Sequence, residues 1–178
     1  FMEKIQVCGD LKEHVRHGLA SFQQRYPPGG GHDGAMLGSD LGDLLSGLQS
    51  RMLAHANWAG ASEDELEASK EGMEKLVVVK LFDTLWMSDP SDASGDAILK
   101  IRLRGVSFMG PEHLDIPPVL RRDDAFSSAR EELCKISGFK APKDKLVCIH
   151  NCCRVLSNTI LKAHSDAEGE TRRSASAD

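Results

Sequence analysis

The chain has 178 residues, a formal net charge of −5 and 40% hydrophobic residues, enough to bury the core of one domain or of a small domain with a partial second one. Its basic residues are scattered and do not alternate with aromatic residues, which excludes a typical nucleic-acid interface. No apolar run approaches the roughly 20 residues that a membrane span needs, and no signal peptide is evident, so direct membrane insertion is not expected.

The first predicted helix covers residues 2–24, in which apolar residues recur at near-helical spacing with one gap at Cys8 and Gly9. A proline- and glycine-rich loop follows through Gly38, because Pro and Gly disfavour a continued helix. Asp40 is the expected N-cap of a second helix that reaches about Asn57.

A capping box at Ser62 and Glu65 predicts the start of a third helix, which the apolar period extends to a stop at Asp89 and Pro90. Residues 91–95 are expected to form a loop, residues 97–105 a short helix, and residues 109–118 a turn of helix between prolines. Residues 124–137 are predicted to be helical again, with Gly138 as the stop.

The central predicted element is a helix over residues 142–161, with Pro142 in its first turn and Asp144 near its N-terminus. Its apolar positions surround most of the helix, which predicts burial on nearly all sides. They are Leu146, Val147, Cys148, Ile149, Cys152, Cys153, Val155, Leu156 and Ile160. Residues 164–177 are expected to be a polar loop. No strand pattern of useful length occurs, so the sequence predicts an all-α fold.

Residues 139–154, FKAPKDKLVCIHNCCR, resemble the signature of the vacuolar protein sorting nine domain family. The family pattern is an aromatic residue followed by Lys-x-Pro-Arg-Asp-Lys-Leu-x-Cys-Ile, with Asn-x-Cys after it. Lys143 stands here in place of the family's Arg. The signature residues of this chain are Pro142, Asp144, Lys145, Leu146, Cys148, Ile149, Asn151 and Cys153.

Two further stretches extend the resemblance from about Ala54 to the C-terminus. Residues 58–82 are similar to the helical bundle that precedes the exchange domain in this family, although this segment taken alone favours an ordinary amphipathic hairpin. Residues 109–118 are similar to a family connector. The resemblance implies a layered helical bundle, in which an N-terminal bundle over residues 1–90 packs on the first half of an exchange domain over residues 91–178. It also implies that further helices follow in the complete domain.

Members of this family are guanine nucleotide exchange factors for Rab GTPases of the Rab-five class, and the resemblance implies that function in endocytic and vacuolar vesicle trafficking. It implies a GTPase regulator, not an enzyme that makes or breaks bonds, at the cytoplasmic face of early endosomes. Asp178 occupies the place of the family's acidic residue that enters the GTPase nucleotide site. The alternative is a helical module that binds a partner in an apolar groove without exchange activity.

Five cysteines without a secretory signal are expected to be reduced thiols in a cytosolic protein. They are Cys8, Cys134, Cys148, Cys152 and Cys153. A zinc site is a weaker alternative for the group around His150, because all its candidates lie on one helix, whereas structural zinc usually draws ligands from two elements. A Cys-His hydrolase is weaker still, because Cys148 and His150 point to different helix faces. No metal or cofactor is therefore expected.

Overall fold

The computed structural model describes residues 1–86, 88–121 and 126–175, and the regular structure in these ranges is helical throughout. The all-α fold predicted from the sequence is confirmed for this part of the chain. Two units share the chain, residues 1–100 and residues 101–178. The finer division at residue 90 stays a prediction.

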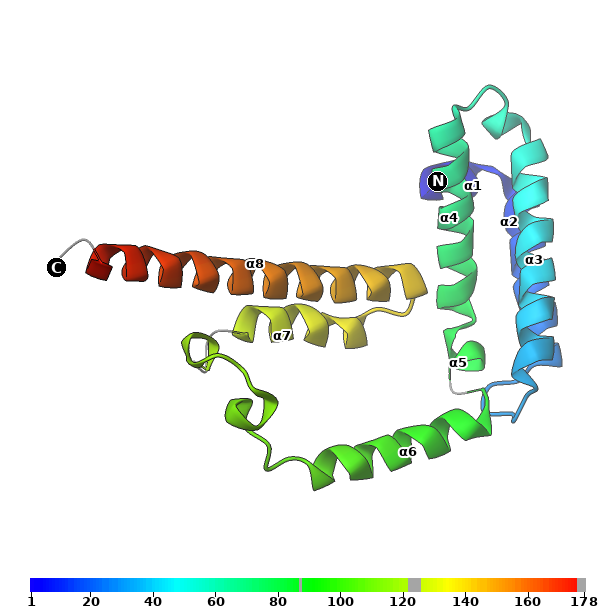
Figure 1. Ribbon diagram of the computed structural model, residues 1–178. Coiled ribbons are helices and arrows are strands. Elements are labelled where there is room, and N and C mark those ends of the chain that lie inside the picture. The colour runs from blue at the N-terminus through cyan, green and yellow to red at the C-terminus, as the bar shows by residue number, and fades with distance from the viewer. Residues whose placement is uncertain (87, 122–125, 176–178) are drawn as a thin grey trace. The chain divides into compact units, whose positions relative to one another are not determined.

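The first unit is a bundle whose core is shared by three helices, α2 (Gly9–Arg25), α3 (Gly34–Ala54) and α4 (Glu63–Lys80). Figure 1 shows α3 and α4 side by side, with α2 along α3. A short helix, α1 (Met2–Val7), precedes α2, and the break between them falls at Cys8, where the sequence has its gap in the apolar period. The buried side chains are spaced by three, four or seven residues and include Leu11, Val15, Phe22, Leu48, Met52, Met73 and Val77.

Helix α3, which is the second helix predicted from the sequence, begins earlier than expected. The N-cap is Asp33, whose carboxylate accepts hydrogen bonds from the backbone N–H groups of Ala35 and Met36 at 2.8 and 3.2 Å. Asp40, the expected N-cap, lies about two turns inside the helix. Its carboxylate accepts the Tyr26 hydroxyl at 2.5 Å and lies 2.7 Å from Arg25 Nη1. The aspartate therefore holds the connecting loop to the bundle.

The turn between α3 and α4 contains a short 3-10 helix, η1 (Ala56–Trp58), and Gly60 with φ of +78°, a conformation that favours glycine. Half of the predicted capping box is present, because Ser62 Oγ accepts the backbone N–H of Glu65 at 3.2 Å. The carboxylate of Glu65 pairs with Lys4 of α1. This ion pair links the first helix to the start of α4.

The predicted stop at Asp89 and Pro90 is a helix start. The preceding helix ends at Lys80, and a single turn, α5 (Phe82–Leu85), follows it. Helix α6 (Pro90–Gly105) then includes the predicted loop at residues 91–95. Asp89 Oδ1 accepts the backbone N–H of Ser91 at 2.8 Å, and this hydrogen bond lowers the pKa of the Asp89 carboxyl. An Asp-Pro pair suits an N-cap and first helical position as well as it suits a stop.

The second unit is built around α8 (Pro142–Ala175), against which α7 (Ser127–Cys134) and the turns η3 (Pro118–Leu120) and η4 (Lys135–Gly138) pack. The turn η2 (Pro111–Leu114) precedes them. The predicted helix at residues 124–137 is confirmed from residue 127, and Asp124 lies outside the described residues. The predicted polar loop at residues 164–177 is wrong up to residue 175, which is helical.

Candidate functional site

The family signature forms the start of α8, where the chain turns from η4 into the long helix (Figure 1). Ala141 is buried, and its carbonyl accepts the backbone N–H of Lys145 at 3.2 Å, the first hydrogen bond of the helix. Pro142 follows at the first helical position, where its missing N–H leaves no partner unsatisfied. The proline of the signature thus fixes where the helix begins.

Lys145 joins the helix to the turn that precedes it. Its Nζ donates a hydrogen bond to the carbonyl of Ile136 in η4 at 3.1 Å. The same carbonyl also accepts the backbone N–H of Phe139 at 3.3 Å, so it receives two hydrogen bonds at the end of η4. Lys145 therefore helps to hold the end of the α7 region against the start of α8.

One face of α8 is buried against the rest of the second unit. Cys148 and Cys152 lie one turn apart with 4% and 9% of their surface exposed, and Ala129 of α7 is also buried. Small side chains at such positions allow two helices to approach closely. The cysteines pack here as small apolar residues, a common role for buried thiols.

A second apolar face of α8 is exposed, and the prediction that this helix is buried on nearly all sides is wrong for the described structure. Leu146 and Ile149 have 63% and 42% of their surface exposed, and Cys153 and Ile160 continue the same stripe along the helix. We call these four residues the α8 stripe. The sequence pattern could not separate the two faces, because both are apolar and helical periodicity alone does not say which one has a partner.

The remaining signature residues flank these two faces. Asn151 is half-buried, and its side chain makes no hydrogen bond to any residue that the structure describes. Asp144 is half-buried in the first turn. His150 is exposed, on a different face from Cys148, and within the described ranges no three His, Cys, Asp or Glu side chains are grouped as metal ligands would be.

Helix α6 also presents apolar side chains without cover. None of its residues is buried, and the exposed set includes Ile98, Leu99, Ile101 and Leu103. Apolar side chains that are exposed together are a feature of interaction sites, which makes α6 a candidate for one. Asp178, the predicted acidic residue, lies outside the described residues.

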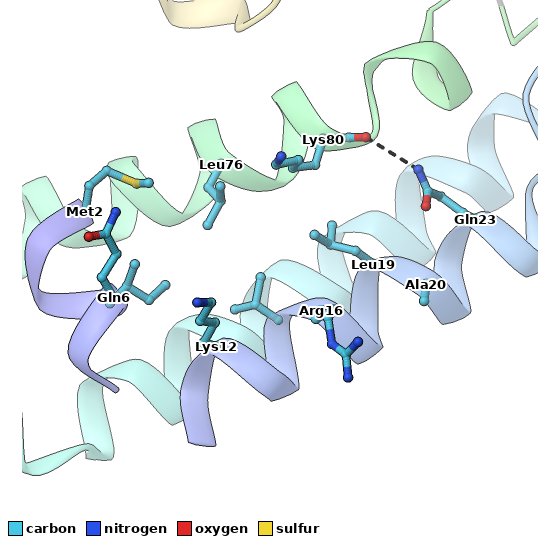
Figure 2. Close-up of a pocket in the computed structure, with 11 residues that line it drawn as sticks. Met2, Gln6, Lys12, Arg16, Leu19, Ala20, Gln23, Leu76 and Lys80 are labelled. Carbon is cyan, nitrogen blue, oxygen red and sulfur yellow. Dashed lines mark hydrogen bonds between the residues drawn. The ribbon is translucent and has the colours of Figure 1, made fainter. Parts of the chain in front are cut away.

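The first unit has a groove that the sequence analysis missed. It lies between α1, α2 and α4 and has a volume of about 760 Å³ (Figure 2). Its lining residues are Met2, Ile5, Gln6, Lys12, Val15, Arg16, Leu19, Ala20, Gln23, Leu76 and Lys80. A signal was present in the sequence, because Lys12 and Arg16 are four residues apart beside the apolar positions Val15 and Leu19, but only the structure brings Leu76 and Lys80 to the same place.

None of the helices in the described part of the chain combines the length and the apolar character that crossing a bilayer requires. A family model described as a domain of unknown function (DUF5601) matches residues 43–82, which include most of α3 and α4.

Known proteins resemble nearly the whole chain. Vacuolar protein sorting-associated protein 9A of Oryza sativa subsp. japonica is 36% identical over 166 residues, which cover 92% of this chain and 34% of that protein. The protein of the same name from Arabidopsis thaliana is 35% identical over 92% of this chain and 31% of its own length. The human GTPase-activating protein and VPS9 domain-containing protein 1 is 30% identical over 70% of this chain and 9% of its own length.

The chain spans about a third of the length of the two plant relatives. The similarity covers both units, and the helix start at Pro142 has the residues of the signature. The chain therefore belongs to the vacuolar protein sorting nine (VPS9) domain family.

Proposed function

We propose that this chain is part of a guanine nucleotide exchange factor that promotes GDP release from small GTPases of the Rab-five class. The observation that carries the proposal is the signature in residues 139–154, folded as the start of a long helix with its proline at the first helical position. The proposed role is in endocytic and vacuolar vesicle traffic, and the relatives named for vacuolar protein sorting support its vacuolar part. In this role the protein regulates a GTPase and forms no covalent bond with its partner.

Asp178 is proposed to be the acidic residue that enters the nucleotide site of the GTPase. There, GDP is held by a phosphate-binding lysine and by Mg²⁺ that bridges phosphate oxygens. A carboxylate inserted beside the lysine pairs with it and repels the phosphates. It stabilises the nucleotide-free GTPase and so accelerates GDP release.

We assign the α8 stripe to the core of the complete exchange domain. Leu146, Ile149, Cys153 and Ile160 lie along one side of a helix whose opposite face is already packed. Burying such a stripe stabilises a helical domain, and leaving it exposed favours association. The family has further helices, including one with a tyrosine at the GTPase surface, and we propose that they cover the stripe and orient Asp178.

The protein is proposed to act in the cytoplasm, peripheral to early endosomes, where a Rab-five-class GTPase is available. Direct membrane insertion is not part of the proposal. The chain requires no metal or cofactor for the mechanism that we propose.

The test is nucleotide release measured with fluorescent GDP. A Rab-five-class GTPase loaded with this nucleotide is mixed with a longer chain that includes the helices after residue 178, and a Rab of another class serves as the control. We expect the longer chain to accelerate GDP release from the Rab-five-class GTPase and not from the control Rab. Binding of the GTPase without acceleration would instead favour the alternative function, a helical interaction module.

A further inference from the structure

The groove between α1, α2 and α4 has an apolar floor and a positively charged edge. Ile5 and Val15 are buried at its floor, and Figure 2 shows Leu19 of α2 and Leu76 of α4 facing each other across it. Both leucines are half-buried. The floor is therefore recessed between helices, and the half-buried leucines keep apolar surface available to an occupant.

Three cations and no carboxylate line this groove, although the chain has a net charge of −5. Arg16 Nη2 lies 2.5 Å from Glu13, so its charge is already paired. Lys12 on α2 and Lys80 on α4 are exposed and make no ion pair with any residue in the described ranges. They stand on the two helices that form the walls (Figure 2). An occupant thus meets an unpaired positive charge on either side of an apolar floor.

The walls of the groove favour a helical occupant. They are α-helices, whose backbone groups are already hydrogen-bonded, so they offer no strand edge to an extended peptide. Gln6 and Gln23 are the amide side chains of the lining, and Gln23 Nε2 already donates to the carbonyl of Lys80 at 3.5 Å. A helix satisfies its own backbone and needs only apolar side chains for the floor. The lining residues of α2, from Lys12 to Gln23, extend over about 16 Å, or three helical turns.

We propose that this groove is a docking site for an acidic amphipathic helix of a partner protein, with carboxylates on both sides of a short apolar stripe. A flat membrane surface fits less well, because it would have to reach the buried floor at Ile5 and Val15, whereas bilayers take up apolar side chains that protrude. The site lies in the first unit and does not depend on the exchange activity proposed for the complete domain.

The probe is a synthetic helical peptide with leucines at alternate spacings of three and four and glutamates on both flanks. A matched peptide has lysine in place of each glutamate. Fluorescence anisotropy measures the binding of each peptide to the 178-residue chain. We expect the glutamate peptide to bind at least about tenfold more tightly than the lysine peptide. Its binding should weaken as the salt concentration is raised, because salt screens exposed charges.

Charge reversal at the edge provides the decisive comparison. The double variant Lys12→Glu, Lys80→Glu should bind the glutamate peptide about tenfold more weakly and the lysine peptide more tightly. The control is Lys100→Glu, at an exposed position on α6, which changes charge without touching the groove and should leave both affinities unchanged. Both lysines of the double variant are exposed, so its helical circular dichroism signal should equal that of the unchanged chain.

Four results would overturn the proposal. The first is equal binding of the two peptides, and the second is an unchanged affinity of the double variant. The third is binding only to vesicles of equal parts phosphatidylcholine and phosphatidylserine, lost in the double variant, which would assign the groove to a lipid surface. The fourth is self-association of the chain in analytical ultracentrifugation that the double variant abolishes, which would assign it to a second copy.

Discussion

Trp58 and Ser69 form a buried hydrogen bond between the α3–α4 turn and the middle of α4, in which the indole Nε1–H donates to Ser69 Oγ at 2.9 Å. The two residues have 2% and 3% of their surface exposed. A buried polar pair of this kind fixes the position of a large aromatic side chain, because each group would be unsatisfied without the other. This hydrogen bond thus adds a specific polar contact to the apolar core at this end of the first unit.

Replacing Ser69 with alanine should destabilise the first unit. The indole N–H would lose its partner in a buried environment, and the expected loss is about 1–3 kcal/mol in the free energy of unfolding. Urea denaturation followed by circular dichroism measures it. Ser50→Ala, at an exposed position on α3, is the control. Coinciding denaturation curves for Ser69→Ala and Ser50→Ala would contradict the role assigned to this hydrogen bond.

The two faces of α8 should respond differently to a carboxylate. Cys148→Asp places a charge at a buried position and should cost several kcal/mol. Ile149→Asp, at a position with 42% of its surface exposed, should cost about 1 kcal/mol or less in this chain. In a longer chain whose additional helices cover the α8 stripe, Ile149→Asp should cost several kcal/mol as well. Equal costs of Ile149→Asp in the two chains, measured in thermal melts, would show that the stripe stays exposed.

Tyr26 makes the first unit sensitive to alkaline pH. Its hydroxyl donates to the Asp40 carboxylate, and this hydrogen bond raises the pKa of Tyr26 above the ordinary value of 10.0. The folded protein therefore holds this proton more tightly than the unfolded chain does. The resulting stability is complete below pH 10.0 and is lost as pH rises through the higher pKa of the folded state.

Tyr26→Phe should remove this part of the alkaline dependence, and the melting temperature of the variant should fall less steeply above pH 10 than that of the unchanged chain. Below that pH the variant should be the less stable protein, because Asp40 loses a hydrogen bond. Parallel melting curves of the two proteins over the alkaline range would argue against the effect. Melts followed by circular dichroism at closely spaced pH values provide the measurement.

Removal of metal should leave the fold intact. The cysteines of α8 lie on one helix, and Cys148 and Cys152 are packed as apolar residues. We expect chelator treatment to leave the circular dichroism spectrum and the melting temperature unchanged, because no metal contributes to the folding free energy. Zinc found in stoichiometric amount after purification, and lost together with the structure on chelation, would overturn this expectation.

Helical periodicity predicted the existence of the helices better than it predicted their ends or which of their faces are buried. The N-cap of α3 was expected at Asp40, but Asp33 has the same capping chemistry and begins the helix about two turns earlier. Asp89 and Pro90 were interpreted as a stop, although the same pair can begin a helix. The polar composition of residues 164–175 favours solvent over a core, and a solvated sequence can still be helical.

The sequence predicted the signature motif of the candidate site, but not which of its side chains would be exposed. The signature correctly indicated the start of α8, and Pro142 is its first residue. The sequence could not show that Cys148 would be buried and Ile149 exposed, because burial depends on which neighbouring helix is present. The groove was missed for a related reason. Lys12 and Lys80 are far apart in the chain, and only the folded structure places them on either side of the same groove.

The rate of fluorescent GDP release from a Rab-five-class GTPase, with and without the carboxylate of Asp178, tests the proposed mechanism most directly. A longer chain with the further helices that we propose after residue 178 should accelerate release, and its Asp178→Asn variant should lose nearly all of that acceleration. Residues 1–178 alone should accelerate release little, because an acidic residue of this kind depends on the elements that position it. Asp166→Asn, at an exposed position on α8, is the matched control and should remain active. Full activity of the Asp178→Asn variant, or of residues 1–178 alone, would contradict the mechanism.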